Sequence, residues 1–136
     1  MGKINTLFII DDDEDDVELF EEAVHEILPT ARCLSAFSCA DGIQKLNDVE
    51  EVLPDIIFLD LNMPGKSGKE CLVEIKKIAR AHKIPVVIYT TSSHERDVQE
   101  TRELGAAHFI TKPSSFSGTV DELLKVISNG AGRTIS

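Results

Sequence analysis

The chain has 136 residues and a mass of 15.0 kDa, a length typical of one domain with a single hydrophobic core. Its hydrophobic content of 42% and charged content of 28% are ordinary globular values, which excludes wholesale disorder. The formal net charge of -10 argues against direct nucleic-acid binding, because phosphate contacts need a basic surface, and favours a protein or a cation as partner.

Short apolar runs alternate with segments of helical period along the whole chain. The five expected strands are Leu7–Ile10, Cys33–Phe37, Ile56–Leu61, Val86–Thr90 and Ala107–Ile110. The first, third and fourth are almost wholly apolar, which is typical of parallel strands that are buried on both faces.

Each expected strand is followed by apolar residues at helical spacing. In chain order these are Val17, Phe20, Val24 and Ile27; Ile43 and Leu46; Leu72, Ile75 and Ala79; Val98, Thr101 and Leu104; and Val120, Leu123, Leu124 and Ile127. Gly105 stands where a glycine commonly ends a helix. Five strand–helix units predict one α/β domain, a doubly wound parallel sheet with helices on both faces. We expect no second domain, and a frayed small, polar tail over 129–136.

Polar residues stand at the ends of four of these strands. Asp11 and Asp12 follow the first strand, Asp60 ends the third with Asn62 two residues on, Thr90 ends the fourth, and Lys112 follows the fifth. Ligands bind at the carboxyl ends of the strands in a doubly wound sheet. We therefore expect these side chains to meet at one edge of the sheet.

The chemistry of these groups points to phosphoryl transfer. Carboxylates and a backbone carbonyl suit Mg²⁺, which takes few protein ligands and keeps several waters. A lysine, a hydroxyl and a metal ion can neutralise and position a transferring phosphoryl group. A carboxylate can itself be the nucleophile and form an aspartyl phosphate. Asp60 is the best candidate, with Asp11 and Asp12 as metal holders.

Asp11 and Asp12 begin a run of six acidic residues. We interpret the other four, Asp13, Glu14, Asp15 and Asp16, as the solvated first turn of a helix, where carboxylates complement the helix dipole. An EF-hand loop is the alternative for the whole run. Its sixth position needs a glycine and here holds Asp16, and a strand rather than a helix precedes it, so this alternative is disfavoured.

With these residues identified, the sequence resembles the receiver domain of bacterial two-component response regulators over essentially its whole length. The resemblance rests on Asp11-Asp12, on Asp60 within the segment FLDLNMPG at 58–65, on Thr90, and on Lys112-Pro113. It implies a receiver domain over residues 1–128 with a flavodoxin-like sheet of strand order 2-1-3-4-5. A weaker resemblance, at the start of the first helix and at 89–93, is to single-domain regulators of phytochrome-type or hybrid sensor kinases.

The resemblance also implies a metal site and a phosphoacceptor. Asp12, Asp60 and the backbone carbonyl of Asn62 would ligate Mg²⁺, and Asp11 would act through water. Asp60 would receive a phosphoryl group from a histidine of a sensor kinase or of a phosphotransfer protein.

Three further residues would respond to that group. Lys112 would contact the phosphoryl oxygens, the Thr90 hydroxyl would move in to hydrogen-bond them, and Phe109 would be the aromatic switch partner. Tyrosine is also common at that position, and Phe109 lacks its hydroxyl. The family pattern further suggests a cis peptide bond between Lys112 and Pro113.

The expected function is a phosphorylatable signalling switch that catalyses its own modification and has no separate substrate. With no output domain expected, the signal would pass by contact with a target, with the kinase or with a second copy of the chain. The alternative is a Mg²⁺-dependent phosphohydrolase acting through an aspartyl intermediate. That enzyme needs a second carboxylate two residues after the nucleophile, where this chain has Asn62.

The remaining sequence features predict a cytoplasmic protein. The chain has an odd number of cysteines, with no C-x-x-C pair: Cys33, Cys39 and Cys71. We therefore expect reduced thiols and neither a disulfide framework nor a zinc site. The apolar runs are far shorter than the ~20 residues of a membrane span. No signal-peptide pattern precedes the first strand.

Overall fold

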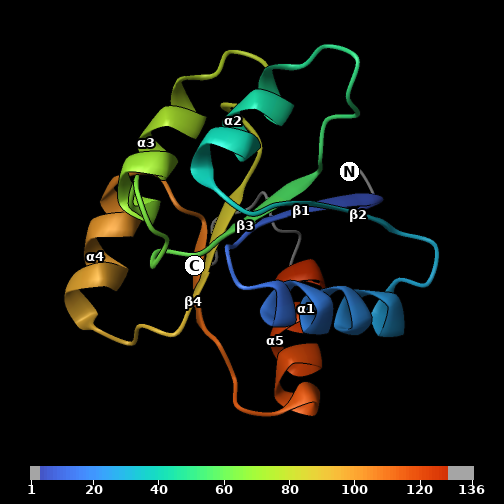
Figure 1. Ribbon diagram of the computed structural model, residues 1–136. Coiled ribbons are helices and arrows are strands. Elements are labelled where there is room, and N and C mark those ends of the chain that lie inside the picture. The colour runs from blue at the N-terminus through green and yellow to red at the C-terminus, as the bar shows by residue number, and fades with distance from the viewer. Residues whose placement is uncertain (1–3, 129–136) are drawn as a thin grey trace.

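The computed structural model describes residues 4–128, which form a five-stranded parallel sheet with helices on both faces (Figure 1). The strands are β1 (Thr6–Ile10), β2 (Arg32–Ala36), β3 (Ile56–Leu59), β4 (Val86–Thr90) and β5 (His108–Thr111). Their spatial order is β2-β1-β3-β4-β5, and all neighbouring pairs are parallel, so the predicted flavodoxin-like order is confirmed. The tail at 129–136 lies outside the described residues.

The helices divide between the two faces of the sheet (Figure 1). On one face lie α1 (Glu14–Ile27) and α5 (Phe116–Ser128), and on the other α2 (Cys39–Asn47), α3 (Gly68–Lys77) and α4 (Glu95–Glu103). Gly105 adopts a φ of 107° just after α4, as expected of a glycine that ends a helix. Along residues 4–128, every helix is too short or too polar to cross a membrane.

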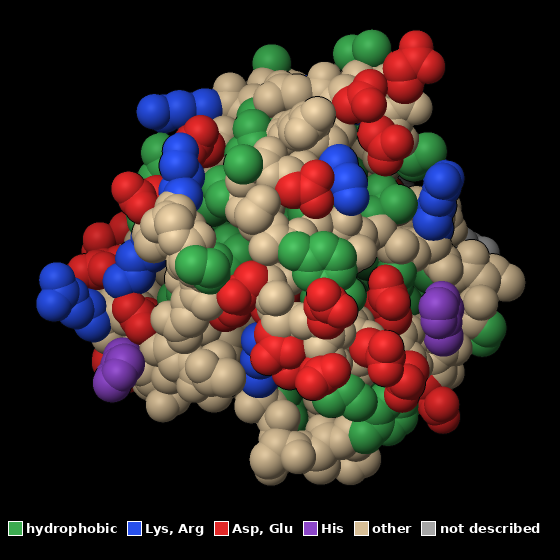
Figure 2. Space-filling model, viewed as in Figure 1, with side chains coloured by type: hydrophobic (Ala, Val, Ile, Leu, Met, Phe, Trp, Pro, Cys, Tyr) green, Lys and Arg blue, Asp and Glu red, His purple; other side chains and the backbone are tan. Residues whose placement is uncertain are grey.

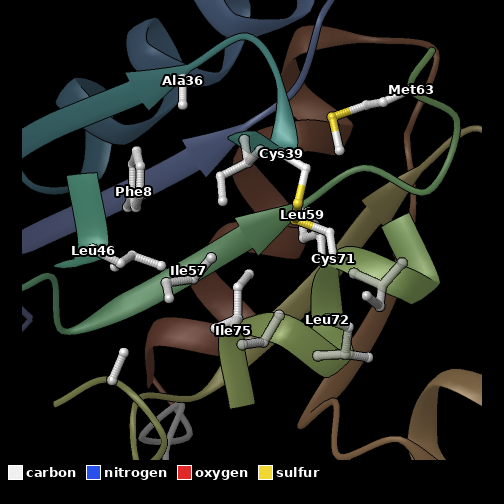
Figure 3. Close-up of a cluster of buried hydrophobic side chains, with 14 of the residues drawn as sticks. Phe8, Ala36, Cys39, Leu46, Ile57, Leu59, Met63, Cys71, Leu72 and Ile75 are labelled. Atoms are coloured by element: carbon white, nitrogen blue, oxygen red, sulfur yellow. A yellow bond between two sulfur atoms is a disulfide. The ribbon is translucent and has the colours of Figure 1, made fainter. Parts of the chain in front are cut away.

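Each face of the sheet has its own apolar core because successive strand residues point to opposite faces. Phe8 and Ile10 of β1 pack with Leu46, Leu72 and other residues under α2 and α3 (Figure 3). Leu7 and Ile9, which alternate with them, belong to the cluster under α1 and α5. A strand with apolar side chains on both faces is therefore fully buried, as β1 is.

Several element boundaries differ from the sequence-based expectation by one residue, and two differ by two residues. The helix α3 ends at Lys77, so Ala79 lies in an exposed turn, and Ala81 is the alanine that reaches the core. The strand β3 ends at Leu59, two residues earlier than predicted. In both cases an apolar residue beyond the end of the element, Ala81 or Leu61, still packs in the core.

Cys39 and Cys71 form a disulfide that joins α2 to α3 (Figure 3). The expectation that all three cysteines are reduced thiols is therefore wrong for this pair. Both side chains are buried in the same core layer, which brings their Cα atoms to 5.8 Å, within the normal range for a disulfide. Cys33 is the free cysteine and is half-buried, and burial raises the pKa of its thiol to about 11.

The peptide bond between Lys112 and Pro113 is trans, as are all those of the described residues. The cis bond suggested by the family pattern is thus absent at this position. The backbone N–H of Lys112 donates to the carbonyl of Thr90 at 2.7 Å, which continues the pairing of β4 with β5 beyond the last strand residue.

Candidate functional site

Three carboxylates lie together where the central strands β1 and β3 end. Asp11 and Asp12 follow β1, and Asp60 follows β3, its neighbour in the sheet. One oxygen of each lies within 4.8 Å of the others. Asp11 and Asp60 are buried, with exposed fractions of 1% and 5%, whereas Asp12 is exposed. Figure 2 shows that acidic side chains also gather on the surface over α1, beside this end of the sheet.

Asp60 is held by its own backbone and by the loop that follows it. Its N–H donates to the carbonyl of Ile10 at 3.1 Å, so it remains aligned with β1 although β3 has ended. Its Oδ1 accepts from the N–H of Asn62 at 3.3 Å. Gly68, the first residue of α3, donates to the carbonyl of Leu61 at 3.0 Å and closes the loop between Asp60 and α3.

Lys112 brings a positive charge into this cluster. Its Nζ lies 2.8 Å from Asp11 Oδ2, 2.7 Å from Asp16 Oδ2 and 3.9 Å from Asp60 Oδ2. Burial disfavours the ammonium, but the hydrogen bonds to Asp11 and Asp16 outweigh burial and raise the pKa of Lys112 above its usual value. Lys112 is therefore a permanent cation that contacts two carboxylates and stops short of the third.

Burial also dominates the electrostatics of Asp11. It raises the pKa of this carboxyl to about 6, against the opposing effect of hydrogen bonds from Lys112 and from the N–H of Asp13. The charge of Asp60 adds to the increase. A buried carboxylate whose pKa is raised by burial and by a neighbouring negative charge, as that of Asp11 is, gains from a bound cation.

The six acidic residues after β1 have four different roles. Asp11 and Asp12 contribute to the carboxylate cluster. Asp13 caps α1 by accepting hydrogen bonds from the N–H groups of Asp15 and Asp16, and the first turn that follows is acidic, as predicted. Asp16 differs, because its side chain is half-buried and bound to Lys112. Its interpretation as a merely solvated residue is wrong.

No sequence pattern singles out Asp16 within the acidic run. Asp16 lies about one helical turn after Asp12, so its side chain points back toward the edge of the sheet. That direction is defined only once the start of α1 is known. Its partner Lys112 is 96 residues away in the chain. A contact between such distant residues depends on the packing of β5 beside β4 and not on local spacing.

Asn62 connects Asp60 with the end of β4. Its N–H donates to Asp60 Oδ1, and its side-chain Nδ2 donates to Thr90 Oγ1 at 3.3 Å and to Thr91 Oγ1 at 3.4 Å. Thr90 is fully buried. Phe109 stands apart from these polar groups: it is half-buried on β5, pairs in register with Ile88 of β4, and packs against the core cluster under α2 and α3.

A second polar network, which the sequence did not indicate, continues from Thr90 toward α4. Ser92 donates to Asp97 Oδ2, and the Ser92 carbonyl accepts from Thr111 Oγ1 at 2.9 Å. Lys69 of α3 pairs with Asp97 and with Glu100 of α4. The loop after Thr90 is thereby attached to α3, α4 and β5.

The donor set of the cluster fits a hard divalent cation. All its side-chain ligands are carboxylate oxygens, and one of them, Asp12, is exposed to solvent, so a bound ion can keep part of its water shell. Histidine and cysteine, which transition metals prefer, do not belong to this group of residues. The arrangement is suited to holding a divalent cation beside Asp60.

The sequence of this chain is similar to those of known signalling proteins. Residues 7–127 match the family described as the response regulator receiver domain. Response regulator Rcp1 of Synechocystis sp. is 32% identical over 128 residues, which cover 89% of this chain and 82% of that protein.

Two solved structures are similar over almost the whole chain. The phosphorylated cyanobacterial phytochrome response regulator RcpA has a TM-score of 0.83 at 26% identity, covering 96% of this chain and 95% of its own. The Mn²⁺-bound form of Rcp1 has a TM-score of 0.79 at 26% identity and covers 97% of both chains. The chain thus belongs to the response regulator receiver domain family and is a phosphoacceptor of two-component signalling.

Proposed function

We propose that Asp60 is the phosphoacceptor and that it receives the phosphoryl group from a histidine of a sensor kinase or of a histidine phosphotransfer protein. In this step a carboxylate oxygen of Asp60 forms a bond to phosphorus as the bond between phosphorus and the histidine nitrogen breaks. The single observation that carries the proposal is the position of Asp60, buried at the end of β3 with a permanent cation 3.9 Å away.

Asp11, Asp12 and Asp60, with the backbone carbonyl of Asn62, are proposed to hold Mg²⁺. The oxygen-only donor set and the exposure of Asp12 support this choice. The similar Rcp1 structure is that of a Mn²⁺-bound protein, which supports a divalent cation in this chain as well. When bound, the ion would neutralise negative charge on the transferring phosphoryl group.

Lys112, Thr90 and Phe109 are proposed to read the modification. Lys112 is the cation that can turn toward the phosphoryl oxygens. Thr90 would exchange its hydrogen bond from Asn62 for one to a phosphoryl oxygen, and the attached loop would follow. Phe109 would adjust its packing on β5 as that loop moves. The result is a shift between two populations that differ on the surface formed by α4 and β5.

The chain is proposed to be its own substrate and not a turnover enzyme. Phosphohydrolase activity through an aspartyl intermediate is not favoured by the family match. The position two residues after Asp60 also carries Asn62, whose amide cannot act as a general acid or base towards a leaving group. We further propose residues 1–128 as the receiver unit, whose signal passes to a protein target or to a second copy of the chain.

We propose the cytoplasm as the site of action, where receiver domains meet the kinase or phosphotransfer histidine. The Cys39–Cys71 disulfide bears on this assignment because disulfides rarely persist in reducing compartments. Rapid alkylation of thiols in intact cells, followed by mass spectrometry, tests it. Reduction of this bond to free Cys39 and Cys71 inside the cell would agree with a cytoplasmic location, whereas a fully formed disulfide there would contradict it.

The test of the phosphoacceptor is chemical labelling. The purified protein is incubated with acetyl phosphate and Mg²⁺, and the product is examined by mass spectrometry for a phosphoryl adduct that hydroxylamine removes. We expect the adduct on the peptide containing Asp60 and its loss in Asp60→Asn. Asp15→Asn, which makes the same charge change at an exposed residue of α1, is the matched control and should be labelled normally. An unlabelled wild type, under conditions that label a known receiver domain, would contradict the proposal.

A further inference from the structure

Asp16 of α1 binds the one cation of the candidate site. Its Oδ2 accepts from Lys112 Nζ at 2.7 Å, as close as the 2.8 Å contact of Lys112 with Asp11. Lys112 is largely buried, with 9% of its side chain exposed, while that of Asp16 is 31% exposed. The pair thus joins the first turn of α1 to the segment after β5, two elements far apart in the sequence.

The contact determines how far Lys112 lies from Asp60. The ammonium has two close carboxylates, and the third, Asp60, is 3.9 Å away, beyond hydrogen-bond distance. Asp11 and Asp16 pull Lys112 to their own side of the cluster. Of these two, only Asp16 lies outside the group of three carboxylates that can hold a metal.

A cation bound to the cluster would weaken the attraction between Asp11 and Lys112, because Asp11 would then also contact a second positive charge. Asp16 does not belong to the group of carboxylates that can bind the cation, so its contact with Lys112 has no such competitor. It is therefore the partner that can keep Lys112 in place whether or not the cluster is loaded. Without it, the ammonium would keep its contact with Asp11 and have a free donor for Asp60, the next nearest carboxylate, where it would compete with the metal.

We propose that Asp16 is a positioning residue, which holds Lys112 back from Asp60 and so leaves the Asp60 carboxylate free to bind the divalent cation. The inference rests on the proposed function, since it assumes that Asp60 is both metal ligand and phosphoacceptor. The first turn of α1 then has two roles: it forms an acidic surface, and through Asp16 it positions Lys112 in the site.

The test compares two alanine variants of α1. Asp16→Ala removes the contact with Lys112. Asp15→Ala removes the same charge from the same helical turn, at an exposed residue whose side chain has no ion pair within residues 4–128. Asp16→Glu restores the carboxylate and should rescue the wild-type behaviour, because the residue is partly exposed and has room to adjust.

Mg²⁺ binding is the first measurement. The chain has one tyrosine and no tryptophan, and the Tyr89 ring lies 5.6 Å from Lys112 Nζ, so tyrosine fluorescence reports on the site. Moving an ammonium from 3.9 Å to hydrogen-bond distance of Asp60 predicts about tenfold weaker Mg²⁺ binding at an effective dielectric constant of about 20. Asp15→Ala should change the affinity less than about threefold, because its charge is exposed and screened.

Two outcomes of the Mg²⁺ binding measurements would overturn the proposal. One is equal weakening of Mg²⁺ binding in Asp16→Ala and Asp15→Ala, which would reduce the effect to net charge. The other concerns the Lys112→Ala background. There the proposal expects Asp16→Ala to have no further effect on Mg²⁺ affinity, so a loss of affinity as large as in the wild-type background would contradict it.

Crystal structures of the metal-free proteins separate this inference from the proposed function. Lys112 Nζ should reach hydrogen-bond distance of Asp60 in Asp16→Ala and remain outside it in the wild type. That result would support the role of Asp16 even if the wild type bound no Mg²⁺, which would contradict only the proposed metal site. An unmoved Lys112 would overturn the positioning role.

Discussion

Gly68 lies against the backbone of Asp60 with no room for a side chain between them. A Cβ atom added at Gly68 would stand 2.4 Å from the carbonyl oxygen of Asp60 and 2.4 Å from the Cα of Leu61. Backbone atoms cannot rotate away as the tip of a side chain can. The first residue of α3 thus packs directly on the residue that we propose as phosphoacceptor.

Gly68→Ala should therefore displace Asp60. We expect a loss of about 1–3 kcal/mol in the free energy of unfolding, which is typical of overpacking in a well-packed region. The rate of labelling by acetyl phosphate should fall as well, because the carboxylate moves with its backbone. Urea unfolding and the time course of labelling measure the two effects.

Gly42→Ala is the matched control for this substitution. Gly42 is also a buried helical glycine, but a Cβ there would meet the tip of the Ile10 side chain, at 2.7 Å from Cδ1. That side chain can adopt another rotamer, and alanine favours the helix by up to about 1 kcal/mol. Equal damage in the two variants would show that the backbone of Asp60 is not the sensitive contact.

The disulfide between Cys39 and Cys71 should add measurably to stability. It closes a loop with a sequence separation of 32 residues, for which the chain-entropy estimate is about 3–4 kcal/mol. Replacing both cysteines by alanine should lower the free energy of unfolding in urea by about this amount. Cys33→Ala, with the disulfide intact, is the control. A non-reduced protein in which all three cysteines react with an alkylating reagent would contradict the bond.

How much of this structure the sequence predicts depends on the range of each interaction. The strands and their order follow from apolar runs such as Ile56–Leu59, since a fully apolar strand must be covered on both faces. The meeting of Asp11, Asp12 and Asp60 follows from the same topology, because parallel strands end at one edge.

The features that the sequence did not predict are contacts across the chain. The Cys39–Cys71 bond and the contact of Asp16 with Lys112 join helices or loops whose relative rotation no local pattern specifies. The role of Gly68 belongs here too. A glycine at the start of a helix is ordinary, and only the packing of α3 shows that its missing side chain makes room for Asp60.

The stability of the protein should depend on His108 at mildly acidic pH. Its Nε2 is buried without a hydrogen-bond partner among the described residues, and burial lowers the pKa of the ring below 6.5. The unfolded chain then binds a proton more readily than the folded one, so His108 disfavours folding as pH falls from 6.5 through its folded pKa. As pH rises beyond 6.5, the ring becomes neutral in the unfolded chain as well and this effect fades.

Replacement of this histidine isolates its contribution. The melting temperature of His108→Gln should fall less steeply than that of the wild type as pH drops below 6.5. His25→Gln, at an exposed position of α1, is the control and should follow the wild-type curve. Parallel curves for the wild type and His108→Gln would show that burial of Nε2 does not disfavour the charged ring.

Crowding of the carboxylates should make the metal-free protein less stable than its Asp60→Asn variant. The cluster places oxygens of Asp11, Asp12 and Asp60 within 4.8 Å, and Lys112 is already engaged by Asp11 and Asp16. Neutralising Asp60 removes repulsion on the order of 1–2 kcal/mol at an effective dielectric constant of about 20. For a domain of this size that corresponds to a rise of roughly 3–8 °C in melting temperature without Mg²⁺.

Mg²⁺ should reverse this order, because an ion that binds only the folded state stabilises it, and a tighter-binding ion stabilises it more at the same concentration. Thermal unfolding at increasing Mg²⁺ concentration should show a large increase in melting temperature for the wild type and a small one for Asp60→Asn. Asp15→Asn, outside the cluster, should keep the wild-type response to Mg²⁺. If Mg²⁺ stabilised the wild type and Asp60→Asn equally, Asp60 would not be a ligand of the ion. If Asp60→Asn were no more stable than the wild type without metal, Lys112 would already compensate the charge of Asp60 from 3.9 Å.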